Sequence, residues 1–136
     1  MRRLILLAVF LAACDLPPDP RKDPPDPKAV FTLVSVDGRP VPIRCDWTSA
    51  RWVLGGNGAW TMRERFVLCD GAERMLADGG WVGKYRWAGD SLVVRTWPAW
   101  FSRSRPFGGS ARLRGDTLVT RGMFTSAELR WVRTGP

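Results

Sequence analysis

Residues able to do covalent or acid–base chemistry are scarce in this chain of 136 residues. It has no histidine, no CxxC motif and no recognisable setting for a nucleophile or for paired catalytic carboxylates. The missing histidine excludes Ser-His-Asp and Cys-His catalysis, and it argues against a metal site. Most carboxylates of residues 29–136 adjoin a glycine, where turn chemistry explains them: Asp37, Asp70, Asp78, Asp90 and Asp116. We therefore expect no enzyme, no metal and no cofactor.

The first of three cysteines follows a short apolar run. Arg2 and Arg3 precede ten apolar residues, 4–13, which is too few to span a bilayer but suits a signal-peptide core. A charged start, a short apolar core, two small residues and then Cys14 resemble the lipobox of bacterial lipoproteins, whose cysteine is lipidated and becomes the mature N-terminus. The alternative is an ordinary secretory signal cleaved after Ala13, but an unpaired exposed thiol is unusual in an exported protein. The resemblance implies a signal peptide over 1–13, acyl chains such as palmitate on Cys14, and a lipid-anchored place in the cell envelope, periplasmic or on the outer face.

The other two cysteines, Cys45 and Cys69, remain as a pair in a compartment that permits disulfides. Closing a loop of 25 residues would constrain the unfolded chain by roughly 3 kcal/mol. We predict this disulfide, with two buried thiols as the alternative.

Residues 14–28 carry the lipidation site and a proline-rich stretch. From Leu16 to Lys28 there are six prolines in thirteen residues, a composition that predicts a semi-rigid tether with almost nothing to bury. Residues 29–136 are long enough for one small domain. They contain 16 basic and 9 acidic residues, a net charge of +7.

Beyond Lys28 the sequence consists of short runs rich in Val, Trp, Leu and Thr, each closed by Gly, Asp, Asn or Pro, which is typical of strands and turns. Asn57-Gly58 between two such runs is a strong hairpin signal. In the stretch 70–80, which interrupts the pattern, we expect a short helical turn. Nine strands are predicted: 29–36, 41–47, 50–54, 59–69, 81–87, 91–97, 110–114, 117–121 and 127–133.

A weak internal repeat supports a meander of hairpins. Residues 89–95 and 115–121 lie 26 residues apart, and each segment opens a strand with a Gly-Asp turn. The strands before them alternate basic and apolar residues, the pattern of a sheet with one wet face. Consecutive antiparallel strands tend to close, because closure removes exposed edges. The sequence therefore predicts an all-β fold, a small antiparallel up-and-down barrel of about 8–9 strands, with a β-sandwich as the alternative.

Four groups of residues add a resemblance to this prediction. They are Phe31-x-Leu33-x-Ser35-Val36-Asp37-Gly38-Arg39-Pro40-Val41-Pro42, the pair Cys45 and Cys69, Gly83-x-Tyr85-x-x-x-Gly89-Asp90-x-Leu92, and Gly115-Asp116-Thr117-Leu118. Together they resemble the small lipocalin-like, or calycin-like, barrel domains of bacterial secreted lipoproteins. The resemblance spans nearly all of residues 29–136 and implies the fold, while its turn and core motifs carry no chemistry.

All eight tryptophans lie in residues 29–136, and we expect Trp60, Trp81 and Trp131 in the core. Alternation places Glu64 on the face of Trp60 and Phe66. A pairing of Glu64 with an arginine at the barrel mouth is favoured over an acid with a raised pKa.

The stretch Trp97–Phe107 contains four aromatic residues and two arginines without strand periodicity. It predicts a long loop with three possible roles. The loop would form a lid over the barrel mouth, a plug folded back on the barrel, or a surface whose Trp100, Phe101, Arg103 and Arg105 touch anionic lipid or glycan.

Two functions of different class fit these observations. One is a binding module for a small lipophilic or amphipathic ligand, with Trp60, Phe66, Tyr85 and Trp87 lining the barrel. The other is a non-enzymatic envelope protein that acts by surface contacts, with a barrel filled by its own side chains, and the many bulky inward residues favour it. We expect the protein to bind the membrane through the lipid on Cys14. Anionic phospholipid or acidic envelope polymer is a more available partner than nucleic acid for an exported basic protein, although a plain solvated arginine surface also explains the charge. We expect a monomer.

Overall fold

The computed structural model describes residues 22–96, 108–123 and 125–136, and every regular element within them is a β-strand. The strands are β1 (Pro27–Val36), β2 (Arg39–Pro40), β3 (Trp47–Gly55), β4 (Ala59–Asp70), β5 (Glu73–Ala88), β6 (Ser91–Thr96), β7 (Gly108–Arg114), β8 (Thr117–Arg121) and β9 (Glu128–Gly135). These residues contain no helix that could cross a membrane. The predicted signal peptide, Cys14 and the stretch 97–107 lie outside the described residues.

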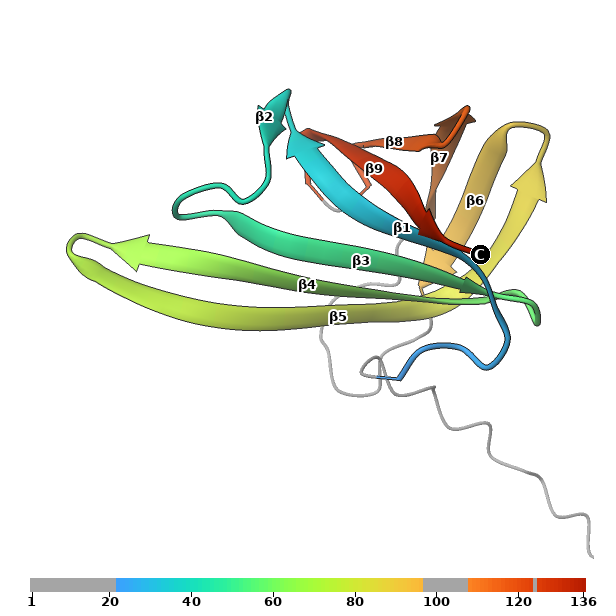
Figure 1. Ribbon diagram of the computed structural model, residues 1–136, viewed down its shortest axis with the longest axis horizontal. Coiled ribbons are helices and arrows are strands. Elements are labelled where there is room, and N and C mark those ends of the chain that lie inside the picture. Colours follow the sequence, from blue (N-terminus) through green and yellow to red (C-terminus); the bar gives the residue numbers. More distant parts are fainter. Residues whose placement is uncertain (1–21, 97–107, 124) are drawn as a thin grey trace, which may run out of the picture.

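Eight strands form one antiparallel sheet that closes on itself. Their order is β1-β3-β4-β5-β6-β7-β8-β9, and β9 pairs back onto β1 from Val30↔Gly135 to Val36↔Leu129 (Figure 1). The two-residue strand β2 is additional and pairs only with the end of β1. The predicted small up-and-down barrel is therefore confirmed, and the sandwich alternative is excluded because one sheet closes the ring.

The two Gly-Asp turns connect adjacent strands as the repeat predicts. Gly89 and Gly115 have φ of 63° and 59°, a left-handed conformation that only glycine adopts without strain. The carbonyl of Asp90 accepts a hydrogen bond from the amide of Leu113 at 2.8 Å, and the carbonyl of Asp116 accepts one from Arg133 at 2.9 Å. Each turn is thus bonded to the strand that follows its hairpin.

The strand predicted over 41–47 is wrong. Only Arg39 and Pro40 pair with β1, and the chain from 41 to 46 is an irregular loop. Pro40 and Pro42 explain the difference, because proline has no amide hydrogen for the ladder. The predicted Cys45–Cys69 disulfide is confirmed, with Cα atoms 5.2 Å apart, and it joins this loop to β4 rather than one strand to another.

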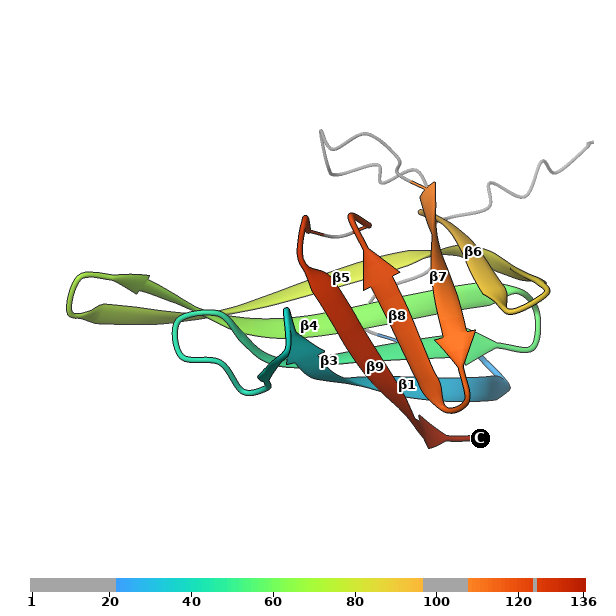
Figure 2. The same cartoon turned by 90° about the horizontal axis from the view of Figure 1, so that it is seen from above.

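The helical turn predicted within 70–80 is also wrong. β4 and β5 pair without a register shift from Ala59↔Lys84 to Asp70↔Glu73, and Gly71 makes the turn with φ of 57°. Figure 2 shows this hairpin extending well beyond the barrel. The helical spacing of the apolar residues in this stretch is weak. Strand pairing continues up to the turn instead, and Gly71 supplies the positive φ that the turn needs.

Alternation along the strands fills the barrel with large side chains. Trp52, Trp60 and Trp131 are fully buried, and the ring centroid of Trp52 lies 5.4 Å from that of Trp60 and 5.5 Å from that of Trp131. Two of the expected core tryptophans, Trp60 and Trp131, are confirmed. Trp81 is half-buried and packs against this core, while Trp52 was not among the expected core residues.

Candidate functional site

The residues proposed to line a ligand cavity occupy different settings. Trp60 is a core residue whose indole Nε1–H donates to the carbonyl of Arg95 at 3.2 Å. Tyr85 is half-buried against the core and its hydroxyl donates to the carbonyl of Gly55 at 2.6 Å. Both side chains therefore complete the barrel's own packing.

The other two described lining candidates lie at opposite ends of the long hairpin. Phe66 pairs with Trp47 of β3 and with Ala77 of β5 in the half of the hairpin nearer its turn, whereas Trp87 is 41% exposed near the far end of β5. Ten residues of strand separate Ala77 from Trp87, about 33 Å at the usual rise per residue. The structure brings Trp60 and Tyr85 to the core but does not bring Phe66 and Trp87 together. Trp100, Phe101, Arg103 and Arg105 lie outside the described residues.

Glu64 has no arginine partner among the described residues, contrary to the favoured prediction. Its carboxylate oxygen Oε1 accepts a hydrogen bond from the indole Nε1–H of Trp81 at 3.4 Å. Burial raises the pKa of Glu64, and the Trp81 hydrogen bond opposes that shift. The nearby Arg65 is on the other face of β4 and pairs with Asp78 at 2.7 Å.

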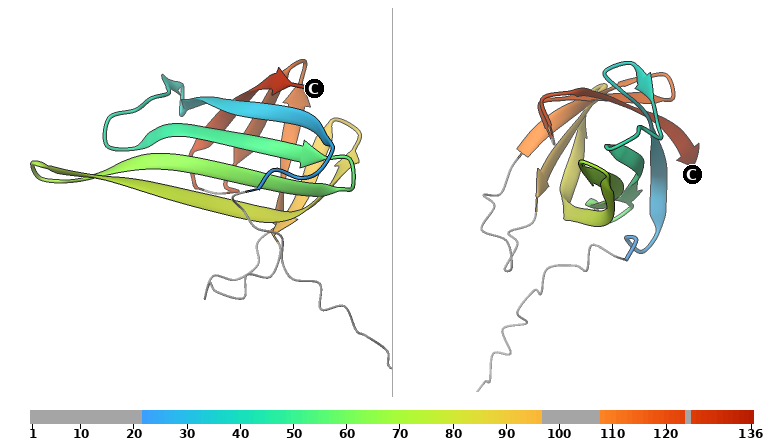
Figure 3. Two further views of the ribbon diagram at one scale, coloured as in Figure 1. Left: turned by 60° about the horizontal axis from the view of Figure 1, so that its bottom comes forward. Right: turned by 90° about the vertical axis from the view of Figure 1, so that its left-hand side faces the viewer.

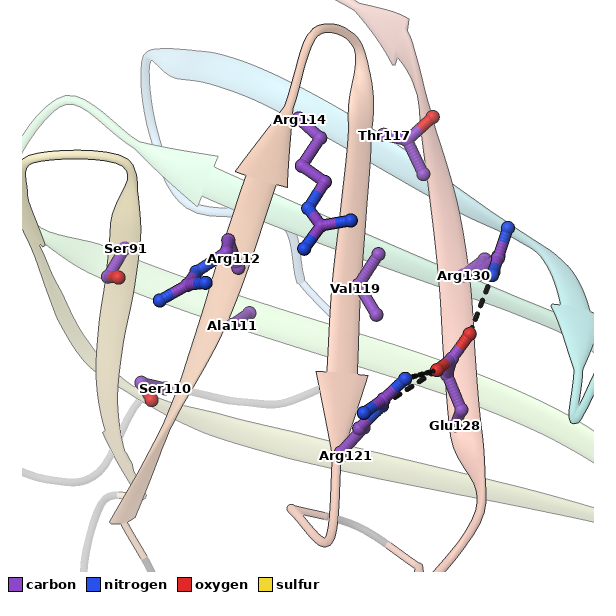
Figure 4. A pocket seen from close by; sticks show the side chains of 10 residues that line it. All are labelled: Ser91, Ser110, Ala111, Arg112, Arg114, Thr117, Val119, Arg121, Glu128 and Arg130. Atoms are coloured by element: carbon purple, nitrogen blue, oxygen red, sulfur yellow. Dashed lines mark hydrogen bonds and ion pairs between the residues drawn. The ribbon is translucent and has the colours of Figure 1, made fainter.

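A groove of about 540 Å³ lies on the outer face of β6–β9 (Figure 4). Mainly outward residues of four successive strands form it, while their neighbours Leu92, Leu118 and Leu129 point into the core. We call it the arginine groove. Its lining residues are Ser91, Ser110, Ala111, Arg112, Arg114, Thr117, Val119, Arg121, Glu128 and Arg130.

The arginine groove has four guanidinium groups and one carboxylate, so its lining charge is +3. Glu128 binds two of the arginines: it accepts from the Nε of Arg121 at 2.7 Å and from the Nε of Arg130 at 2.8 Å. These hydrogen bonds lower the pKa of Glu128. The shared carboxylate holds two cations side by side and neutralises only one of them.

The remaining two arginines are less engaged. Arg112 lies 3.8 Å from a carboxylate oxygen of Asp90, which is a loose contact, and both side chains are largely exposed. Arg114 is exposed and has no ion pair within the described ranges. Guanidinium groups bind carboxylates and phosphates in a bidentate manner, and Ser91, Ser110 and Thr117 add neutral hydroxyl donors. The groove therefore suits an anion with neighbouring hydroxyl groups.

A second groove, of about 660 Å³, runs over β3, β4 and β5, but its arginines are already paired. Asp23 lines this groove and belongs to residues 22–26, which we call the docked segment. The carboxylate of Asp23 bridges Arg51 at 2.8 Å and Arg63 at 2.6 Å, and Pro24 is buried. This part of the proline-rich tether is thus bound to the barrel, in contrast to the expectation that it buries almost nothing.

The two grooves lie on opposite walls of the barrel. In the end-on view of Figure 3, β7–β9 form one side, and the chain entering β1 lies towards the other, next to β3 and β4. The arginine groove therefore faces away from the wall to which the docked segment is bound.

Sequence reasoning found the alternating arginines at 112 and 114 but not the groove. Arg121, Glu128 and Arg130 come from later strands, and their approach to Arg112 depends on the register of β7, β8 and β9. The alternation of Arg121 with buried Thr120, and of Arg130 with buried Leu129 and Trp131, was the available signal.

No family model matches this chain, and no curated protein and no solved structure is significantly similar to it. The fold and the grooves place it in the class of small closed antiparallel barrels with a packed interior. No group of three or more His, Cys, Asp or Glu residues that could hold a metal ion occurs in the described parts of the chain.

Proposed function

We propose that this protein is a lipid-anchored, non-enzymatic domain of the bacterial cell envelope that binds an acidic glycan through the arginine groove. The observation that carries the proposal is the set of four guanidinium groups in one groove on the outer barrel wall, only two of which are paired with Glu128. The three buried tryptophans support external rather than internal binding, because they occupy the middle of the barrel.

The position of the docked segment favours a glycan over the anchoring bilayer. The chain that leads from Cys14 meets the barrel beside Arg51 and Arg63, on the wall opposite the arginine groove. A surface that faces away from the attachment side meets polymers of the envelope more readily than the headgroups beneath it. Sugar hydroxyls also complement Ser91, Ser110 and Thr117.

The binding test uses the unlipidated mature chain, residues 15–136, with polygalacturonate as a carboxylated glycan and phosphatidylglycerol vesicles as the lipid arm. We expect saturable binding to polygalacturonate that weakens with salt. The double variant Arg112→Ser with Arg114→Ser should bind about tenfold more weakly, since each exposed charge contributes up to ~1 kcal/mol.

The matched control is Arg44→Ser with Arg86→Ser, which removes the same charge from exposed positions outside the groove. An equal loss of affinity in this control would show that binding depends on the net charge of the protein and not on the arginine groove. Stronger binding to the vesicles than to the glycan would contradict the choice of partner.

The anchor is tested separately by mass spectrometry of the mature protein. A diacylated or triacylated Cys14 at the N-terminus is expected from the lipobox resemblance. An unmodified Cys14, or a chain that still begins at Met1, would refute the anchor without affecting the glycan result.

A further inference from the structure

The outer part of the β4–β5 hairpin, from the pair Arg65↔Asp78 to the turn at Gly71, includes the end that protrudes from the barrel (Figure 1). We call it the hairpin tip. The three most exposed large apolar side chains of the described residues lie here: Met75 at 64%, Leu76 at 57% and Leu68 at 50%. Such a concentration of exposed apolar residues on a soluble surface marks an interaction site.

The two edges of the hairpin tip differ. The edge of β4 is covered by the loop before β3: the amide of Val67 donates to the carbonyl of Asp46 at 2.9 Å, and Cys69 is linked to Cys45. On the β5 side, the ladder with β6 begins only at Gly83↔Thr96. Within the described ranges, residues 73–80 of β5 pair with β4 alone, so no described strand occupies their other edge, which can accept a further strand.

The ladder determines which backbone groups face the open edge. The amide of Tyr85 donates towards β4, to the carbonyl of Gly58 at 2.8 Å. Backbone direction alternates along a strand, and this ladder has no register shift. The N–H and C=O groups of Arg74, Leu76 and Asp78 therefore face outward.

We propose that the hairpin tip is a dimerisation surface, on which β5 of a second copy of this chain pairs antiparallel with β5 about Leu76. In this register Leu76 lies opposite Leu76 of the partner subunit, and Arg74 lies opposite Asp78 of the partner subunit. The two-fold axis repeats the Arg74–Asp78 pair, so the interface contains two complementary charge pairs. Centring the pairing on Arg74 or on Asp78 would instead place like charges opposite each other, which disfavours those registers.

Apolar contacts agree with the same register. Val67 shares a face with Leu76 through their cross-strand pairing, and Leu68 shares the other face with Met75. The joined sheet would place the two Leu76 side chains in contact on one face. On the other face, Met75 would meet Ala77 of the partner subunit. Leu76 and Met75, the two most exposed apolar residues, would both gain neighbours.

The arrangement also avoids a collision between the barrels. Antiparallel pairing about Leu76 sends each barrel beyond the tip of the other hairpin, because the body of each chain lies towards Gly83. The proposed dimer departs from the monomer expected from the sequence.

Sedimentation equilibrium of the unlipidated mature chain tests the proposal. Residues 15–136 include every strand, the core and the disulfide. The parent chain is expected to pass from monomer to dimer between about 1 µM and about 1 mM, the range of a small edge-to-edge interface. Arg74→Asp and Asp78→Arg should each weaken dimerisation about 10- to 100-fold, because each reversal turns two attractive pairs into repulsive ones.

Mixing the two variants gives the decisive measurement. Arg74→Asp carries two acidic residues at the edge and Asp78→Arg carries two basic ones, so the mixture should form a heterodimer although neither variant dimerises well alone. Arg86→Asp is the control: it makes the same charge change on the same strand at an exposed position outside the tip. A parent that stays monomeric over this range, dimerisation unaffected by both reversals, or a mixture without a heterodimer would each overturn the proposal.

Discussion

Gly83 lies at the closest approach of β5 to the buried indole of Trp60, and replacing it with alanine tests how tightly the barrel is packed. A β-carbon there would lie 1.8 Å from the carbonyl oxygen of Arg95 and 2.6 Å from the Nε1 of Trp60. The same carbonyl accepts the Trp60 hydrogen bond at 3.2 Å. Because backbone is the first obstacle, alanine fits only if β5 and β6 separate at the start of their ladder.

Two contributions determine how much stability Gly83→Ala should lose. Overpacking of a tight interior costs about 1–3 kcal/mol, and loss of the indole hydrogen bond costs about 1 kcal/mol. We therefore expect a loss of about 3 kcal/mol in the free energy of unfolding. For a domain of this size that corresponds to a fall of about 10–15 °C in Tm.

Urea unfolding followed by tryptophan fluorescence and near-UV circular dichroism measures the loss. The control is Gly79→Ala, whose β-carbon meets only the side chain of Glu64, at 2.5 Å from Oε1. That flexible side chain can turn away, so the control should lose less than about 1 kcal/mol. A Gly83→Ala protein as stable as the parent, or an equal loss in the control, would refute the account of a packed barrel wall.

Four further outcomes are expected. Cys45→Ser with Cys69→Ser should lower the free energy of unfolding by about 3 kcal/mol in urea melts, since the bond closes a separation of 24 residues; an unchanged midpoint would contradict this. Burial raises the pKa of Glu64 above 4.5, so the folded protein holds this proton more tightly than the unfolded chain and loses stability as pH rises past that value. Glu64→Gln should therefore exceed the parent in stability at about pH 7 and match it near pH 4, and a constant difference would count against the pKa shift. Asp23→Asn should release the docked segment, with faster tryptic cleavage beside it and a loss of about 1 kcal/mol; unchanged cleavage would show that Pro24 alone holds the segment. Glu128→Gln should tighten polygalacturonate binding up to about fourfold, the effect of one unit charge a few ångströms away in water, whereas weaker binding would mean that Glu128 chiefly orients its arginines.

The local features of the barrel were predictable because they depend on neighbouring residues. Alternation at Trp60 and Met62, the Asn57-Gly58 turn and the Gly-Asp turns are each encoded within a few positions. Gly58 does adopt a positive φ, of 78°, and the side chain of Asn57 accepts from the amide of Ala59 at 3.1 Å. These signals suffice for strands and hairpins, and closure follows from their number.

The site was harder to predict because it depends on where separate strands stop and how they align. Phe66 and Trp60 share a face of β4, but sharing a face does not specify distance along the strand: Trp60 is fully buried in the core, whereas Phe66 is only partly buried at the start of the ladder with β3. The docked segment shows the same limit: Gly55 leaves room for Pro24, since a β-carbon there would lie 2.5 Å from it, and composition alone does not reveal a contact across 31 positions of sequence.

The ladder between β1 and β9 has a consequence for how the protein folds. Val30 pairs with Gly135 and Val36 with Leu129, so the ring is completed by contacts between residues that are 93 to 105 positions apart. Until β9 is in place, β1 and β8 each have an unpaired edge that invites association with other chains. Pairings of such long range are also slow to form. The chain is therefore most prone to aggregation late in folding, when seven of its eight barrel strands are already made, and removing β9 would leave it in that state permanently.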